Sequence, residues 1–129
     1  MDQHEPLGHW LEIVEDDQRG IERLLAHLAD VIGTPETGTI GLPVLSRIAE
    51  FCVRHIQNEE RIMAVMKYSG LPTHSEDHNR IFNAVLTALA DCERFGELEW
   101  GEFSDAFTEM YRRHAANFDQ PLLETLECR

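Results

Sequence analysis

Apolar residues recur every three to four positions along almost the whole chain, which is the spacing of one face of an α-helix. Short segments marked by glycine or proline interrupt this pattern, and Pro43 suits the first turn of a second helix. The pattern predicts four helices, over residues 10–31, 43–66, 74–95 and 103–118, with Pro121 disturbing the end of the last. Nothing in the sequence alternates as a β-strand does.

Helices of about 20 residues joined by short connections pack as antiparallel neighbours. We therefore expect an all-α protein, an antiparallel up-down-up-down four-helix bundle. It would form a single domain over residues 1–129, beginning with a short N-terminal arm at residues 1–9. No internal repeat or linker divides the chain.

Five polar residues occupy positions that the pattern assigns to the apolar faces. They are His55 and Glu59 of the second helix, His74 and His78 of the third, and His114 of the fourth. Residues four apart lie on one face of a helix, about one turn from each other. Counting from the turns on either side places these residues, and Gln18 of the first helix, at one level of the bundle.

A single histidine on an apolar face is more often a hydrogen-bonded core residue than a metal ligand, but four histidines and a carboxylate at one level are different. Buried charge is unfavourable unless it is paired or bound to metal. Imidazole suits iron, zinc and copper, and a bridging carboxylate suits a pair of cations. Bundle cores hold such sites between facing helices. We therefore predict a dinuclear metal site in the core.

Asp119 is a sixth candidate ligand, five residues after His114. On a regular helix it would lie well off the face of that histidine. It could turn inward only if the helix were locally distorted, and Pro121 is a plausible reason for a distortion. Taken alone, the position of Asp119 predicts a solvated surface acid.

Composition narrows the range of partners. The formal net charge of −13 disfavours binding to nucleic acid, where basic surface supplies most of the affinity, and to an anionic membrane. No apolar run approaches a membrane span, and the first residues lack the features of a signal peptide. Three cysteines without CxxC spacing indicate neither a disulfide framework nor a zinc site. We expect a cytoplasmic protein with reduced thiols.

The three histidine motifs, in this order, resemble the hemerythrin family, specifically the single-domain bacteriohemerythrins, over about residues 13–124. The matching string is His55-x3-Glu59, His74-x3-His78 and His114-x4-Asp119, with Glu60, Met63 and Tyr68 also standing where the family has them. The resemblance implies two iron ions, Fe2+ or Fe3+, with a bridging oxo or hydroxo group. It assigns His74, His78 and His114 to one iron, His55 to the second, and Glu59 and Asp119 to both.

The chain departs from the family on its first helix, which usually supplies another histidine to the second iron. Matching the letters places Arg19 at that position, whereas the apolar stripe places Gln18 there. A ligand must face the core, so Gln18 is the better match. Glu22, one turn after Gln18, is a possible substitute ligand, and the alternative is a solvated helix residue beside Arg23.

The resemblance implies a non-haem di-iron protein that binds O2 or another diatomic molecule such as NO, as a carrier or sensor. The missing histidine favours a redox-responsive or sensing site over a long-lived oxygen carrier, and a sensor would need a separate signalling partner. One alternative is a di-iron oxidase, peroxidase or NO-detoxifying enzyme that uses the extra open position. Another is a metal-poor bundle kept for protein interaction. A ferritin-like store is disfavoured, because such sites are rich in glutamate.

Overall fold

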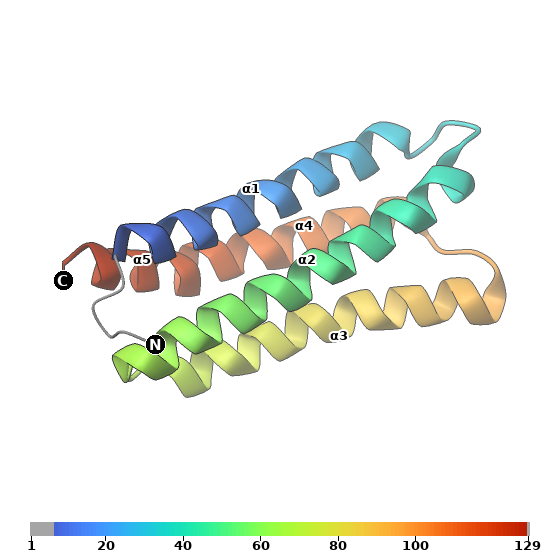
Figure 1. The fold of residues 1–129 in the computed structure, drawn as a ribbon. Helices are drawn as coiled ribbons and strands as arrows, with labels where there is room; N and C mark the ends of the chain where they lie inside the picture. The colour runs from blue at the N-terminus through green and yellow to red at the C-terminus, as the bar shows by residue number, and fades with distance from the viewer. Residues whose placement is uncertain (1–6, 129) are drawn as a thin grey trace.

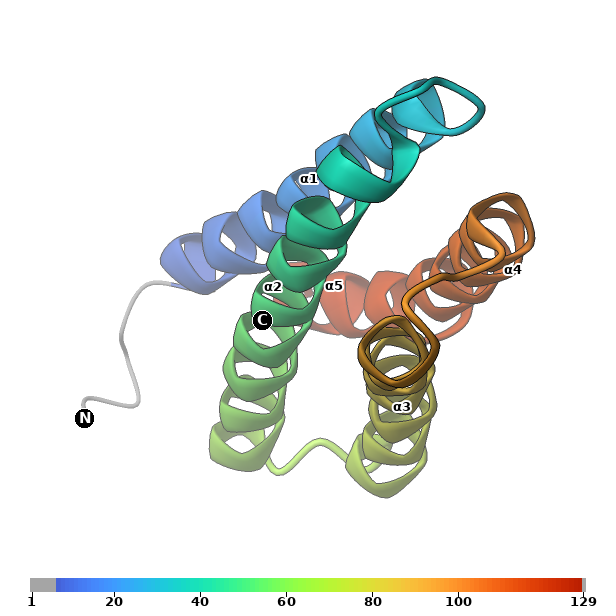
Figure 2. The same ribbon diagram turned by 90° about the vertical axis from the view of Figure 1, so that its right-hand side faces the viewer.

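The computed structural model describes residues 7–128, which form helices joined by short turns and contain no strand. The long helices in this range are α1 (Leu7–Val31), α2 (Thr37–Met66), α3 (Leu71–Phe95) and α4 (Trp100–His114). A π-helical turn, η1 (Ala115–Asp119), continues α4 into α5 (Gln120–Glu127). Neighbouring helices run side by side in alternating directions (Figures 1 and 2). The protein is all-helical, as predicted, and its arrangement is consistent with a four-helix bundle.

The second helix begins at Thr37, so the predicted start at Pro43 is wrong. Pro43 lies inside α2 with its ring exposed, where it costs the helix one backbone hydrogen bond. Packing offsets that loss, because Gly41 is buried against the indole of Trp100 at the start of α4. The Thr37 hydroxyl also donates to the Val31 carbonyl oxygen at 2.8 Å. Tertiary contact thus extends the helix beyond the local signal.

The first helix begins at Leu7, so residues 7–9 belong to α1 and not to a separate arm. Residues 1–6 of the predicted arm lie outside the part of the chain that the structure describes. The Trp10 side chain is 5 % exposed, and its burial ties the first turns of α1 to the core. No helix that the structure describes has the length and apolar content that crossing a membrane requires.

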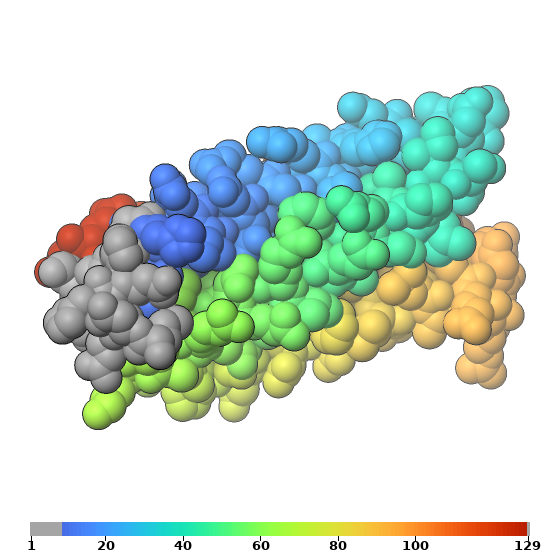
Figure 3. Space-filling view, viewed as in Figure 1, coloured from blue at the N-terminus to red at the C-terminus, as the bar shows by residue number. Residues whose placement is uncertain are grey.

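Two apolar clusters fill the interior. One lies toward the α1–α2 and α3–α4 turns and includes Ile21, Ile48, Val85 and Phe107. The other lies toward the opposite end and includes Trp10, Val14, Ile62, Met63, Leu122 and Leu126. On the face drawn in Figure 3, described side chains of α2 pack against those of α1 on one side and those of α3 on the other. Between the two clusters, α2, α3 and the α4–η1 segment each contribute polar residues instead of apolar ones.

Candidate metal centre

Six polar side chains from α2, α3 and the α4–η1 segment meet between the two apolar clusters. They are His55, Glu59, His74, His78, His114 and Asp119, and none is more than 3 % exposed. We call these six residues the buried cluster. All six were predicted from the sequence to share one level, Asp119 only through the family resemblance, and the structure brings them together.

Glu59 lies at the centre of the buried cluster. Its Oε1 atom is 2.9 Å from the Nε2 atoms of both His55 and His78, and 3.1 Å from that of His74. The His114 Nε2 atom lies 3.9 Å from the same oxygen. One carboxylate oxygen therefore faces imidazole nitrogens from both α2 and α3.

The two oxygens of Asp119 face different histidines. Oδ1 lies 2.8 Å from His114 Nε2 and 3.1 Å from His74 Nε2. Oδ2 lies 3.3 Å from His55 Nε2, and it accepts a hydrogen bond from the Gln18 amide at 3.1 Å. The carboxylate thus spans the buried cluster from the α3–α4 side to the α1–α2 side.

The π-helical turn η1 is what brings Asp119 inward. The Gln120 N–H donates to the Ala115 carbonyl oxygen, five residues earlier. A turn with one extra residue places residue i+5 under residue i, whereas a regular helix would rotate it by about 140°. Asp119 is fully buried as a result, so its interpretation as a surface acid from position alone is wrong. Pro121, which has no N–H to offer, follows directly in the first turn of α5.

The donor set fits a metal ion. Ligand atoms of His55, Glu59, His78, His114 and Asp119 all lie within 4.8 Å of one another. His55 Nε2 and His114 Nε2 are buried and form no hydrogen bond with any residue in the described range, although each approaches a carboxylate oxygen closely. Imidazole and carboxylate donors that face one shared point approach each other in this way. This arrangement could hold a metal ion, and imidazole with carboxylate suits several transition metals.

The charges of the buried cluster reinforce one another. Burial opposes protonation of His114, but the nearby Asp119 and Glu59 carboxylates outweigh it and raise its pKa to about 9. Glu59 and Asp119 likewise raise the pKa of His55 well above its usual value despite burial. Burial opposes ionisation of Glu59, yet the neighbouring imidazoles hold its pKa well below normal. The Glu59 carboxylate is therefore ionised at neutral pH, and protonated imidazoles or a bound cation would balance its charge.

Outer partners fix how two of the rings are oriented. His78 Nδ1 lies 3.0 Å from Glu60 Oε2, which also accepts a hydrogen bond from Ser75 at 3.2 Å. His114 Nδ1 lies 2.7 Å from Asp77 Oδ2. A carboxylate on Nδ1 holds a proton there and leaves the Nε2 lone pair free to bind a metal. Sequence reasoning named Glu60 but missed Asp77, because Asp77 serves a histidine on another helix and no spacing rule reveals that pairing.

Helix α1 presents Gln18, not Arg19, to the buried cluster. The Gln18 amide reaches Asp119, whereas Arg19 is exposed and pairs with Asp16 on the surface. Helical periodicity predicted that Gln18, and not Arg19, faces the core, and the structure agrees; its place at the ligand position stays a prediction. Glu22 is exposed and lies outside the buried cluster.

A neighbouring buried acid was not predicted. Asp17 is 4 % exposed and accepts a hydrogen bond from Asn58 at 2.9 Å. Burial raises the pKa of Asp17. This pair joins α1 to α2 beside the buried cluster. Asp17 lies three residues after Val14 and four before Ile21, so helical periodicity distinguishes it from the adjacent Asp16.

Comparison of the chain with protein-family models, with curated proteins and with solved structures found no match.

Proposed function

We propose that this protein is a hemerythrin-type di-iron protein that binds a small diatomic ligand, O2 or NO, as a sensor or reversible binder. The observation that carries the proposal is the convergence of His55-x3-Glu59, His74-x3-His78 and His114-x4-Asp119 on one buried layer. Six polar side chains in the core would destabilise a bundle that is held together only by apolar packing. The π-helical turn at Asp119 adds weight, because such turns occur frequently at functional sites.

The two faces of Asp119 support a pair of metal ions. Oδ1 faces His74 and His114, and Oδ2 faces His55. Glu59 Oε1 is surrounded by nitrogens, while its Oε2 is buried and has no hydrogen-bond partner among residues 7–128. Asp119 directs one oxygen toward each side, and Glu59 directs Oε1 at histidines of both sides, so both carboxylates could be shared between two cations. His74, His78 and His114 would hold one iron, and His55 the other.

The surrounding residues keep the buried cluster dry and rigid. The Phe118 ring packs 5.4 Å from the His74 and His114 ring centroids. Glu60 and Asp77 hold the Nδ1 atoms of His78 and His114. An iron pair held there would supply the electrons that stabilise a bound diatomic molecule. The protein's part is to exclude bulk water and to hold the imidazoles in place, which suits binding without hydrolysis or proton loss.

The side facing α1 has the fewest donors. Gln18 is a neutral amide whose nitrogen is already directed at Asp119, and an amide is a weak ligand beside imidazole. An iron near His55 would keep more positions open to small ligands. Lower imidazole donation favours rapid oxidation over a long-lived oxygenated form, so sensing is the favoured role.

A di-iron oxidase, peroxidase or NO-removing enzyme is the second candidate. One observation favours it, namely a groove of about 780 Å³ between α1 and the α4–η1–α5 rod. A diatomic ligand needs far less room, and a volume of this size suits a small organic molecule. Sustained turnover with a reductant would distinguish this activity from binding.

The deciding experiment is reconstitution with ferrous iron without air, a count of the bound metal, and then admission of O2 while the absorption spectrum is followed. Two irons per chain and a new band that disappears when O2 is removed would support reversible binding. Two irons with immediate conversion to a stable ferric spectrum would support a sensor or an oxidase. Fewer than two irons would contradict the di-iron proposal.

A matched pair of variants ties the metal to the buried cluster. Glu59→Gln removes the charge of the central carboxylate, and Glu93→Gln makes the same change at an exposed position of α3. Glu59→Gln should lower the bound iron below two per chain, and Glu93→Gln should not. Equal metal content in the two variants would place the iron elsewhere.

A further inference from the structure

The Tyr111 hydroxyl is a buried donor without a partner. Tyr111 lies on α4, one turn before His114, and is 3 % exposed. Within the described part of the chain its hydroxyl has no hydrogen-bond partner. A buried hydroxyl left unpaired is unfavourable, so a native protein that keeps one there requires an explanation.

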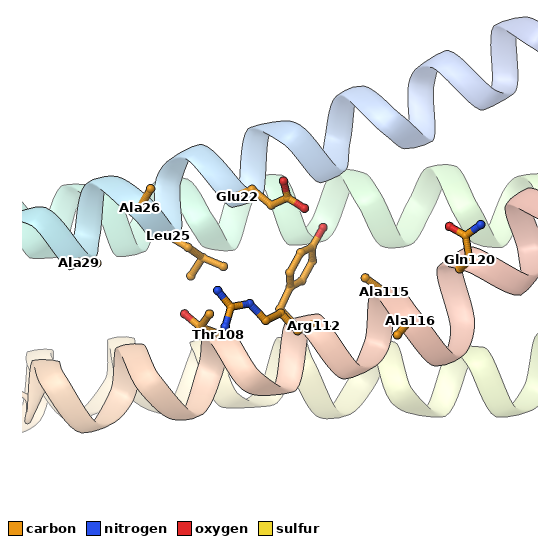
Figure 4. Close-up of a pocket in the computed structure, with 10 residues that line it drawn as sticks. Glu22, Leu25, Ala26, Ala29, Thr108, Arg112, Ala115, Ala116 and Gln120 are labelled. Carbon is orange, nitrogen blue, oxygen red and sulfur yellow. The ribbon is translucent and has the colours of Figure 1, made fainter.

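Tyr111 lines the groove, and its hydroxyl is near enough to Asp119 and Glu59 for their charges to act on it. Figure 4 shows the groove between α1 and α4, with the Glu22 carboxylate extending from α1 toward α4. Tyr111 and Glu22 both line the groove between α1 and the α4–η1–α5 rod. Burial, followed by the charges of Asp119, Glu22 and Glu59, raises the pKa of Tyr111. The phenol therefore stays protonated, and the negative charges of carboxylates in the groove and in the buried cluster both act on it.

The same side of the buried cluster is the one with the fewest protein ligands. Gln18 and Glu22 lie one turn apart on α1, and neither supplies an imidazole. Across the groove, Ala115 follows His114 directly and adds only a methyl group to the wall. Tyr111 and Ala115 line the groove on either side of His114 along the α4–η1 segment, so a small molecule in the groove would approach the buried cluster past Tyr111.

We propose that Tyr111 is a ligand-binding residue, whose hydroxyl donates a hydrogen bond to a small anion bound on the α1 side of the metal pair. This inference rests on the proposed di-iron function and adds to it the residue that would bind the outer atom of the ligand, and the route by which the ligand would enter. A metal pair held by the buried cluster would supply positive charge, and Tyr111 would supply one donor to the outer atom. Such a hydrogen bond to a charged acceptor is among the stronger ones in proteins.

The test is an azide titration of the ferric protein, followed by absorption, for the unchanged chain and two variants. Tyr111→Phe removes the donor and keeps the ring, and Tyr68→Phe makes the same change at the other tyrosine, which packs with the second apolar cluster. We expect azide to bind about tenfold more weakly to Tyr111→Phe. Tyr68→Phe should leave the affinity unchanged.

Two further measurements separate ligand binding from a structural role. The azide stretching band of the unchanged protein should shift in D2O, and this shift should be lost in Tyr111→Phe. Glu22→Gln tests whether the hydroxyl serves Glu22 instead. Under our proposal this variant binds azide as tightly as the unchanged protein or more tightly, because a nearby negative charge has been removed. If Tyr111 served Glu22, the two variants would lose similar stability and neither would lose azide affinity.

The outcomes distinguish the two proposals. Two irons per chain with equal azide affinity in Tyr111→Phe and the unchanged protein would overturn the role of Tyr111 and leave the metal centre intact. Two irons with no D2O shift in the unchanged protein would do the same, and that measurement needs no variant to fold. Failure of the unchanged protein to bind two irons would overturn both.

Discussion

The side chain of Gln18 decides how the α1 side of the buried cluster behaves. Its amide nitrogen donates to Asp119 Oδ2 at 3.1 Å, which holds that carboxylate in place and withdraws some of its electron density. An imidazole at position 18 would act in the opposite sense, because it would add a donor to the metal and leave Asp119 free to bridge. In the proposed metal pair, one residue would thus separate a fully ligated centre from one with an open side.

Replacing Gln18 with histidine should therefore strengthen metal binding. We expect Gln18→His to slow the loss of iron to a chelator by about tenfold, in line with the effect of ligand-shell changes on metal affinity, and to slow oxidation in air. Chelator competition and the absorbance of the ferric form measure the two effects. Arg19→His is the matched control, because Arg19 is exposed, and it should change neither rate. An effect of Arg19→His alone would mean that the other face of α1 meets the metal.

At the scale of elements, periodicity predicts the body of each helix and misses what depends on contacts distant in sequence. The stripes identify His55, His74, His78 and His114 as core-facing because burial at every third or fourth position is what stabilises these helices. The start of α2 is missed because it depends on the contact between Gly41 and Trp100. Asp77 and Tyr111 are missed because their roles depend on which helix lies opposite.

The η1 turn is the element that local rules predict least well. A regular helix directs the side chain five residues after His114 away from the core, and only the family resemblance and Pro121 indicated otherwise. The turn also restores the register of α5, whose Leu122 and Leu126 are almost fully buried. One extra residue in the rod therefore serves both the buried cluster and the apolar core beyond it.

Removing or adding one residue in η1 should have opposite results. Deleting exposed Ala116 places the aspartate four residues after His114, a spacing that faces the core on a regular helix. We expect this variant to keep two metal ions and a melting temperature within a few degrees of the original. Inserting an alanine after Ala116 rotates Leu122 and Leu126 by about 100° and should cost several kcal/mol, with loss of metal.

Thermal melting followed by circular dichroism, together with a metal count, distinguishes these variants. The control variant has an alanine inserted after Glu97, in the exposed turn between α3 and α4. It tests whether adding a residue anywhere in the chain is harmful, and we expect it to be tolerated. If the deletion and the insertion lowered the melting temperature and the metal content by similar amounts, the π-helical turn itself, and not the register it sets, would be required.

Across the whole molecule, the buried cluster divides the core into two apolar halves. Neither half extends through the layer that holds Glu59, His78 and Asp119. The net charge of −13 adds repulsion to the folded state, and the two carboxylates in the layer concentrate negative charge at its centre. Divalent cations would balance that charge and connect α2, α3 and the α4–η1 segment through their ligands.

Metal binding should therefore contribute a large share of the stability. A ligand present at a thousand times its dissociation constant stabilises the native state by about 4 kcal/mol, and for a domain of this size each kcal/mol corresponds to about 4 °C. We expect removal of iron by a chelator to lower the melting temperature by about 15 °C. In Glu59→Gln, which binds the metal poorly, the chelator should have little effect, because the loss has already occurred. An unchanged melting temperature on removing two bound irons would show that the apolar halves stabilise the bundle without them, and that the buried cluster contributes to function alone.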